Sequence, residues 1–373
     1  MIYLDYGATS FHKPPAVYRA AERAMRTCAN PGRGGYGAAM EAAKTVFDCR
    51  AAAAELFSCD PAQVVLTTSC THGLNIAIRS VVKPGSRVVV TGFEHNAVTR
   101  PLHAMGAEII VAGRRLFDWD NTLEEFEKAL KGADAAVFTH VSNVFGYILP
   151  VGELAALCRR KGVPFIIDAA QSAGTLPVDF SALGADFIAM PGHKGLLGLP
   201  GTGLLLCGQR GEPLLYGGTG TQSIRQDMPE ELPERLEAGT LNAHGLAGLN
   251  AGVGYLLETG VDRIRQIELD LMWAFYEGVN AIPGITVYGD FSGRERCPIV
   301  SLNVRDYDSS QVSDALFSEF GIATRPGAHC APLMHEALGT HQRGAVRFSF
   351  SHYNTMEEIE FAVSALREIA REE

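Results

Sequence analysis

Short apolar segments alternate with amphipathic helical patterns between about residues 60 and 210. Continuous apolar strands separated by helices are typical of a largely parallel sheet that is covered by helices on both faces. The sequence predicts strands at 64–66, 87–91, 108–111, 135–139, 163–167, 186–190 and 203–206. It predicts helices between them, for example at 73–82, 121–130 and 151–161. The pattern therefore indicates an α/β fold.

The remainder of the chain divides into three parts. Residues 217–233 are rich in Gly, Thr, Gln, Pro and charge, which predicts a long exposed loop, and such loops are often functional. A helix-rich stretch at 246–280 precedes a smaller α/β module that runs from residue 283 to the end. For a chain of 373 residues, about two domains are expected. We predict a large domain at 16–255 and a small domain at 256–373, with residues 1–15 joining the small domain.

Composition excludes several classes of protein. The net charge of −10 argues against a nucleic-acid-binding surface. No apolar run approaches ~18 residues, so no membrane span is predicted. The N-terminus has no basic region followed by an apolar stretch, so no signal peptide is predicted. The eight cysteines contain no Cys-x-x-Cys pair and are interpreted as the reduced thiols of a cytoplasmic protein.

A lysine and an aspartate stand at the ends of two predicted strands. Lys194 follows the strand at 186–190, and Asp168 ends the strand at 163–167. Ligands of such sheets bind beyond the carboxyl ends of the strands, so both side chains are expected in one crevice. This pair suits pyridoxal phosphate, because a lysine forms its Schiff base and a carboxylate keeps its pyridinium nitrogen protonated. The alternatives are a solvated surface lysine and a helix-capping aspartate.

Three further polar residues follow strands at the same predicted edge. Thr71 opens a helix, where free N–H groups and hydroxyls suit a phosphate, although a cap without a ligand has the same pattern. His95 can stack on a planar cofactor or move protons, or be a hydrogen-bonded loop residue. Asn143 can donate to a ring oxygen or form a turn. No Gly-x-Gly-x-x-Gly or Walker-type loop follows a strand, which disfavours a dinucleotide or ATP enzyme.

The C-terminal module carries a cysteine in a loop. Gly and Pro flank Cys330 on both sides, and the neighbouring His329 and Arg325 favour its thiolate. The alternative is an inert loop cysteine. The spacing of Cys330 with His329, His335 and His341 fits no common zinc pattern, so no metal site is predicted.

Arg347 lies in the otherwise apolar, strand-like run at 346–350. A cation in such a run needs an anion. The guanidinium fork can hold a substrate carboxylate, or it can pair with a structural Asp or Glu.

Taken in order, these residues resemble the class V aminotransferase family of fold-type I pyridoxal-phosphate enzymes, and within it the cysteine desulfurase and selenocysteine lyase group. The resemblance runs nearly end to end. Its most specific motifs are Asp168-Ala-Ala-Gln171, Gly192-His-Lys194, Glu237-Ala-Gly-Thr240 and the segment from Arg325 to Cys330. It implies a mostly parallel seven-stranded sheet between helices and a smaller C-terminal α/β domain that carries the cysteine loop.

The resemblance also implies roles for individual residues. Lys194 would hold the cofactor and move protons, His95 would act in acid–base steps, and Cys330 would be the nucleophile. Cofactor contacts are implied for Cys70, Thr71, His95, Asn143, Asp168, Gln171, His193, Lys194 and Thr240. Substrate contacts are implied for Ala8, Asn143, Arg325 and Arg347. In this family the threonine at the position of Thr240 reaches the phosphate of the neighbouring subunit, which implies a homodimer.

The implied reaction converts L-cysteine to L-alanine and leaves the sulfur on Cys330 as a persulfide, which passes to an acceptor protein. Three alternatives remain open: a selenocysteine lyase, another class V enzyme (an aminotransferase, an epimerase or a different carbon–sulfur lyase), or a non-enzymatic sulfur-trafficking scaffold. Four departures from the family pattern, Tyr6, Gly7, Tyr36 and Pro191, bear on substrate choice. At the position of Pro191 the family often has a serine whose hydroxyl contacts phosphate.

Overall fold

The computed structural model describes residues 1–32, 34–293 and 295–371. Arg33 of the predicted large domain, and Arg294 and the last two residues of the predicted small domain, therefore lie outside the described part. Within it, no helix combines the length and the apolar character needed to cross a membrane.

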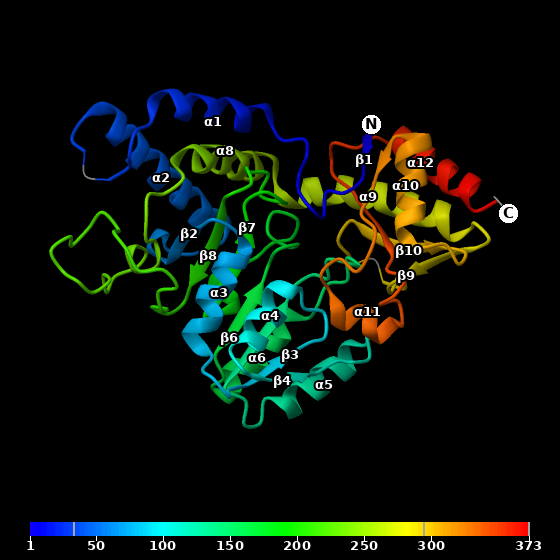
Figure 1. Cartoon of the computed structure of the whole chain (residues 1–373), viewed down its shortest axis with the longest axis horizontal. Helices are drawn as coiled ribbons and strands as arrows, with labels where there is room; N and C mark the ends of the chain where they lie inside the picture. The colour runs from blue at the N-terminus through cyan, green and yellow to red at the C-terminus, as the bar shows by residue number, and fades with distance from the viewer. Residues whose placement is uncertain (33, 294, 372–373) are drawn as a thin grey trace.

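A seven-stranded sheet forms the centre of the larger part of the molecule (Figure 1). Its order is β2-β8-β7-β6-β5-β3-β4, and every pairing is parallel except those that β8 makes with β2 and β7. The strands are β2 (Val64–Thr67), β3 (Arg87–Val90), β4 (Glu108–Val111), β5 (Ala135–Thr139), β6 (Phe165–Asp168), β7 (Phe187–Pro191) and β8 (Gly203–Cys207). This sheet confirms the predicted α/β fold.

Helices cover both faces of the sheet. They are α1 (Pro15–Thr27), α2 (Gly37–Leu56), α3 (Cys70–Val81), α4 (Asn96–Ala104), α5 (Trp119–Ala129), α6 (Val151–Lys161), α7 (Phe180–Leu183) and α8 (Ala243–Thr259). Two short 3-10 turns, Pro61–Gln63 and Glu234–Leu236, precede β2 and α8. The segment at 217–233 contains no helix or strand among its described residues, as predicted for a long loop.

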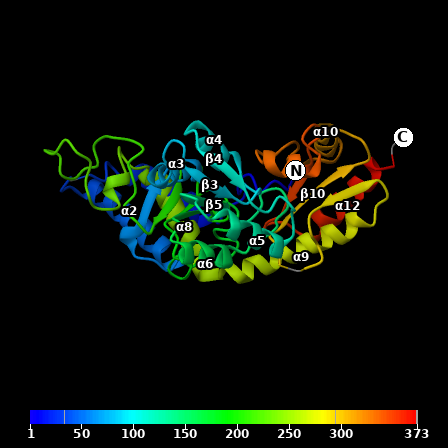
Figure 2. The same ribbon diagram turned by 90° about the horizontal axis from the view of Figure 1, so that it is seen from below.

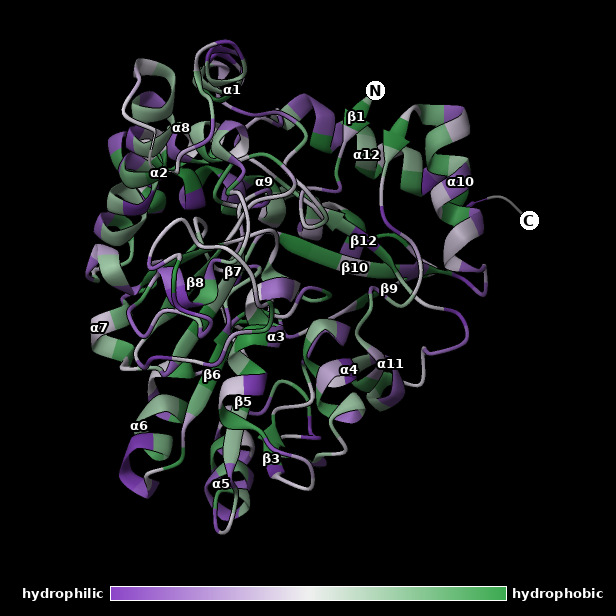
Figure 3. Ribbon diagram, turned by 60° about the vertical axis from the view of Figure 1, so that its left-hand side comes forward, coloured by the Kyte–Doolittle hydropathy of each residue, from purple (hydrophilic) through white to green (hydrophobic). Residues whose placement is uncertain are grey.

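Alternating side chains of the central strands build two separate cores. Val88 and Val90 pack into the core beneath α3 and α4, whereas Val89 between them joins the core beneath α2 and α6. Successive residues of a strand point to opposite faces, so a strand buried on both faces must be apolar throughout. Figure 3 shows hydrophobic strands at the centre of the large sheet, surrounded by helices that carry both hydrophobic and hydrophilic residues.

The smaller part contains an antiparallel sheet, β12-β10-β9, and a parallel pair, β1-β11. Its strands are β1 (Ile2–Tyr3), β9 (Ile285–Tyr288), β10 (Ile299–Val304), β11 (Ile322–Ala323) and β12 (Val346–Ser349), and its helices are α10 (Ser309–Phe320), α11 (Pro332–Leu338) and α12 (Met356–Ile369). The long helix α9 (Val261–Asn280) runs from the larger part beneath this sheet (Figure 2). Because β1 pairs with β11, the chain begins in the smaller part and then crosses to the larger one.

One predicted helix boundary was wrong for a local reason. The helix predicted at 73–82 begins at Cys70, because the Ser69 hydroxyl caps it by accepting from the His72 N–H. The helix-rich stretch predicted at 246–280 is confirmed; it consists of the two helices α8 and α9, which are divided at Gly260, a residue with φ +85°.

Candidate active site

One cavity opens at the carboxyl edge of the large sheet and encloses about 690 Å³, part of it open to solvent. Pockets of this size suit small molecules. The predicted site residues that line it are Cys70, Thr71, His95, Asn143, Asp168, Gln171, His193 and Lys194. All predicted cofactor residues except Thr240 therefore share one cavity, as expected for side chains that follow neighbouring parallel strands.

Asp168 ends β6 and is almost fully buried. Its Oδ1 accepts from the Ala170 N–H at 2.9 Å and lies 3.5 Å from the Cys70 thiol. The carboxylate is therefore held at the cavity wall by an Asx turn, not by a helix cap. Burial and the nearby Asp168 raise the pKa of Cys70 well above its usual range, so this thiol is neutral.

Lys194 follows β7 in a tight turn and is half-buried. Burial lowers the pKa of its amine, and the positive charge of Arg347 lowers it further. An amine with a lowered pKa is more often unprotonated, which both imine formation and proton abstraction require.

The N-terminus of α3 forms one end of the cavity. Ser69, Cys70 and Thr71 line the cavity at this helix start, where the helix dipole and N–H groups favour an anion. His193 lies nearby, with its Nδ1 3.1 Å from the Thr9 hydroxyl. Burial, with the charges of Lys194 and Lys13, lowers the pKa of His193 to about 4, so its ring is neutral.

His95 caps α4 with its own ring. Nδ1 accepts from the Ala97 N–H at 3.0 Å, so the proton of the neutral ring is on Nε2. Burial lowers the pKa of this histidine. Glu94, which is fully buried, holds the turn before it by accepting from the N–H groups of Thr91 and Gly92.

Cys330 is the exposed cysteine of this chain, and its backbone is fastened beside His95. The Asn96 N–H donates to the Cys330 carbonyl at 2.7 Å. The Asn143 amide donates to the carbonyl of His329 at 2.8 Å, so in this structure Asn143 supports the cysteine loop. Residues from the small part of the molecule thus reach the rim of the cavity.

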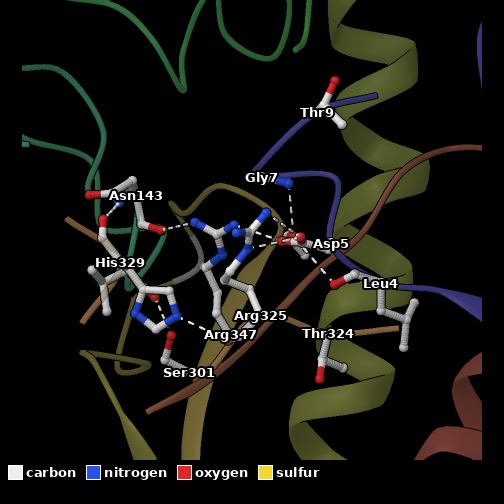
Figure 4. A network of polar contacts seen from close by, with 12 residues as sticks. Leu4, Asp5, Gly7, Thr9, Asn143, Ser301, Thr324, Arg325, His329 and Arg347 are labelled. Atoms are coloured by element: carbon white, nitrogen blue, oxygen red, sulfur yellow. Dashed lines mark hydrogen bonds and ion pairs between the residues drawn. The ribbon is translucent and has the colours of Figure 1, made fainter. Parts of the chain in front are cut away.

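Arg347 lies in β12 with its guanidinium buried (Figure 4). Its Nη2 lies 2.8 Å from Oδ1 of Asp5, and its Nη1 donates to the Asn143 carbonyl at 2.9 Å. Arg325 binds the other oxygen of Asp5 through Nε and Nη2, at 3.1 and 3.0 Å. Of the two counter-anions that the sequence left open for Arg347, the structure places Asp5 there. Nε of Arg347 is buried and, among the described residues, has no hydrogen-bond partner.

The N-terminal segment connects these arginines to the lysine. The Gly7 carbonyl accepts from the Gln171 amide at 3.0 Å, and the Ser10 N–H donates to the His193 carbonyl at 2.8 Å. Ala8 lies between them, and its N–H donates to the Asp5 carbonyl. A second cavity, which contains Tyr6 and Gly7, lies on this side and shares Gln171 and Lys194 with the first.

Three other singled-out residues lie apart from one another. Pro191 ends β7 and lines the first cavity, where it offers no hydroxyl. Tyr36 is exposed at the start of α2. Thr240 is exposed and lines a separate hollow beside Arg50. It therefore does not line the cavity that contains Lys194 of the same chain.

Two residues at the site were missed in the sequence. Asp5 was not singled out, although a carboxylate directly after an apolar pair, Tyr3-Leu4, is a signal for a buried ion pair. Glu94 precedes His95 and gives no comparable signal, because a Glu after a strand is commonly exposed.

The residues of the first cavity suit pyridoxal phosphate. The start of α3 offers N–H groups and hydroxyls for a phosphate, Asp168 is a buried carboxylate for a ring nitrogen, and Lys194 is an amine with a lowered pKa. All three groups line the same cavity in this structure.

Comparison with known proteins agrees with this chemistry. The model of the family "Aminotransferase class-V" matches residues 2–361. A probable cysteine desulfurase of Methanothermobacter thermautotrophicus is 33% identical over 99% of this chain and 94% of its own length, and a cysteine desulfurase of Haloferax volcanii is 31% identical over 100% and 90%. The apo structure of a cysteine desulfurase from Thermococcus onnurineus superposes with a TM-score of 0.90 at 31% identity, covering 99% of this chain and 94% of the other. The chain belongs to the class V aminotransferase family, whose members use pyridoxal phosphate.

Proposed function

We propose that this chain is a cysteine desulfurase, which converts L-cysteine to L-alanine and takes the sulfur on Cys330 as a persulfide. One observation carries the proposal: an exposed cysteine is fastened by its own carbonyl to Asn96, next to His95 in the cavity of Lys194. The full-length relatives named cysteine desulfurase support the same activity.

Pyridoxal phosphate would be bound by the residues of the first cavity. The start of α3 with Thr71, together with His193, would hold its phosphate, Asp168 its ring nitrogen, and Gln171 and Asn143 its ring hydroxyl. When bound through Lys194, the cofactor supplies an electron sink for the substrate's α-carbon.

The chain's own residues would then bind and position the amino acid. The guanidinium of Arg347 would receive the α-carboxylate, and its buried Nε lacks a hydrogen-bond partner among the described residues. Arg325 and Ala8 would flank it. Lys194, with its lowered pKa, would accept the α-proton and later return a proton to the carbon skeleton. The Nε2–H of His95 would serve as a proton donor close to the sulfur.

The sulfur step requires the Cys330 thiolate. A sulfur–sulfur bond forms between Cys330 and the substrate as the substrate's carbon–sulfur bond breaks, and the electron pair passes to the carbon skeleton. Uptake of protons at that skeleton releases L-alanine. The persulfide would then pass to an acceptor protein, for which the exposed position of Cys330 is suitable.

We infer that the active form is a homodimer. Thr240 lines a hollow between α2 and the loops at 30–32 and 218–221, away from the cavity of its own chain. Large apolar side chains are exposed on these and adjoining segments: Tyr36, Met40, Phe47, Leu215, Tyr216 and Ile224. Exposed apolar side chains on the segments that form or adjoin this hollow suit a partner surface, and a second copy would bring its Thr240 to the phosphate.

The decisive experiment measures alanine formed by the purified, cofactor-loaded protein from L-cysteine or L-selenocysteine, with Cys330→Ala run alongside. Alanine from L-cysteine that disappears in the variant is the expected result. Alanine from L-selenocysteine alone, unaffected by the substitution, would instead assign a selenocysteine lyase. No alanine from either substrate would overturn the proposal and leave another class V reaction.

A further inference from the structure

Two histidines behind Cys330 have no part in the proposed reaction. The sequence grouped His329 and His335 with Cys330 and His341, in a spacing that fits no common zinc site. In the part of the chain that the structure describes, no three His, Cys, Asp or Glu side chains are arranged to hold a metal. His329 and His335 instead lie ring to ring, with centroids 5.7 Å apart and planes 23° from parallel.

The loop that they support has an unusual backbone. His329 and Cys330 have φ angles of +52° and +56°, so two successive non-glycine residues are in the left-handed region. Such conformations persist only where surrounding contacts hold them. On the carbonyl side, these contacts are the Asn143 amide to His329 and the Asn96 N–H to Cys330.

On the side-chain side, a directional chain of hydrogen bonds holds the loop. Nε2 of His329 lies 3.0 Å from the Arg325 carbonyl, which can only accept, so this nitrogen carries the proton. Nδ1 of the neutral His329 is then an acceptor for Nε2 of His335, a long contact of 3.5 Å. This leaves Nδ1 of His335 to accept from the Thr340 hydroxyl at 2.9 Å.

His335 occupies the buried end of this chain. It lies on α11 and is 1% exposed, whereas Cys330 is exposed at the other end of the same loop. Burial lowers the pKa of His335, and burial together with the charge of Arg347 lowers that of His329 to about 3. Both rings are therefore neutral near neutral pH, and the donor–acceptor order stays fixed.

We propose that His335, oriented by Thr340, is a positioning residue that acts through His329 to hold the backbone of Cys330 in its left-handed conformation beside His95. The inference goes beyond the proposed desulfurase reaction, and its catalytic readout rests on that reaction. It assigns a role to two histidines that do not line the cavity of Lys194. Among the described residues, neither histidine makes a hydrogen bond to the side chain of Cys330.

A matched pair of substitutions at residue 335 distinguishes a role for the hydrogen bond to His329 from a role for the packing of the side chain. His335→Gln places an amide nitrogen about where Nε2 of histidine lies, so the bond to His329 is retained. His335→Asn places its amide about where Nδ1 lies, so that bond is lost. Thr340→Val removes only the hydroxyl that orients His335, and it carries the test if His335→Asn does not fold.

Two readouts are measured on the cofactor-loaded protein. In His335→Asn and Thr340→Val, kcat for alanine formation should fall about three- to tenfold, the effect of one lost hydrogen bond, while KM for L-cysteine stays unchanged. Hydrogen–deuterium exchange at the Asn96 amide should become faster, because this amide lies on another element and reports only the hold on Cys330. His335→Gln keeps the bond to His329 but not the bond to Thr340, so it should be impaired less than His335→Asn in both readouts.

The opposite results are equally distinct. Unchanged exchange at Asn96 in His335→Asn and in Thr340→Val would overturn the proposal, and equal impairment of His335→Gln and His335→Asn would reduce His335 to a packing residue. If the wild type forms no alanine from L-cysteine, the proposed function fails, but the exchange comparison still decides the role of His335.

Discussion

Asp5 and Arg347 are 342 positions apart in the sequence, yet the Asp5 carboxylate lies 2.8 Å from the guanidinium of Arg347 and binds Arg325 through its other oxygen. One carboxylate is thus shared by two guanidinium groups, and the cluster keeps a net charge of about +1. A substrate carboxylate would neutralise that charge. Asp5 therefore orients Arg347 without cancelling its attraction for an anion.

Asp5→Asn tests this arrangement. The two arginines lose their common anion, so Arg325 should turn to solvent and Arg347 should lose its orientation. We expect KM for L-cysteine to rise about tenfold or more while kcat changes less, because Arg347 is no longer held in the orientation that binds the substrate carboxylate. Uncompensated burial of Arg347 should also lower the free energy of unfolding by about 3 kcal/mol.

Steady-state kinetics and urea unfolding measure the two effects. Asp48→Asn is the control, since Asp48 pairs with Lys44 on the surface and should leave both quantities unchanged. A KM for L-cysteine equal to that of the wild type would show that Asp5 has no part in carboxylate binding.

Lys194→Ala should remove both the covalent link to the cofactor and the proton carrier. We expect kcat to fall roughly a thousandfold. Dialysis should strip the cofactor from this variant, which visible absorbance records. Lys13→Ala is the comparison, because Lys13 is also buried with a pKa lowered to about 8 but, among the described residues, donates its side-chain hydrogen bonds to Ser10 alone. Retained visible absorbance in Lys194→Ala after dialysis would contradict the assignment.

The residues that follow the strands of the large sheet could be predicted from the sequence. Thr71, His95 and Asp168 each come after an apolar run, and parallel strands deliver their carboxyl ends to one edge, so the periodicity alone places them together. Lys194 was predicted to lie beside Asp168 for the same reason. Each of these inferences needs only local pattern and the topology that the pattern implies.

Contacts between the two parts of the molecule could not be predicted in this way. No local pattern tells that Asp5 meets Arg347, or that Asn96 holds the carbonyl of Cys330, because these pairs depend on how α9 and the N-terminal segment orient the smaller part. The hydrogen bonds by which Glu94 holds the turn before His95 could not be predicted for another reason, because a short polar segment allows many hydrogen-bond patterns.

Acid should destabilise the protein between pH 6.5 and about 4. Burial lowers the pKa of His140 and His193 to about 4 in the folded state, whereas both titrate near 6.5 when unfolded. In this window the unfolded chain binds more protons, so the free energy of unfolding falls as the pH falls, by at most about 1.4 kcal/mol per pH unit for each histidine. Urea unfolding at several pH values measures the slope, and His140→Gln should reduce it. A flat profile across this window would be the contrary result.

Glu237 fastens the segment that carries Thr240. Its carboxylate binds Arg50 through both oxygens, at 2.8 and 3.0 Å. It also accepts from the N–H of Leu66 in β2, an edge strand of the large sheet. The pair is largely buried, so removing one charge leaves the other unpaired. Glu237→Gln should therefore lower the free energy of unfolding by about 3 kcal/mol.

The same substitution should weaken the hold on the cofactor if Thr240 serves the neighbouring subunit. We expect Glu237→Gln to release pyridoxal phosphate faster on dilution and to shift the dimer toward monomer, as sedimentation would record. Glu234→Gln, three residues earlier, is the matched control, because Glu234 makes no hydrogen bond to Arg50 among the described contacts. Faster cofactor release in both variants alike would trace the effect to the loss of a negative charge in this segment. Release confined to Glu237→Gln would tie it to the fastened segment, because only that variant loosens Thr240 from the sheet that holds Asp168 and Lys194.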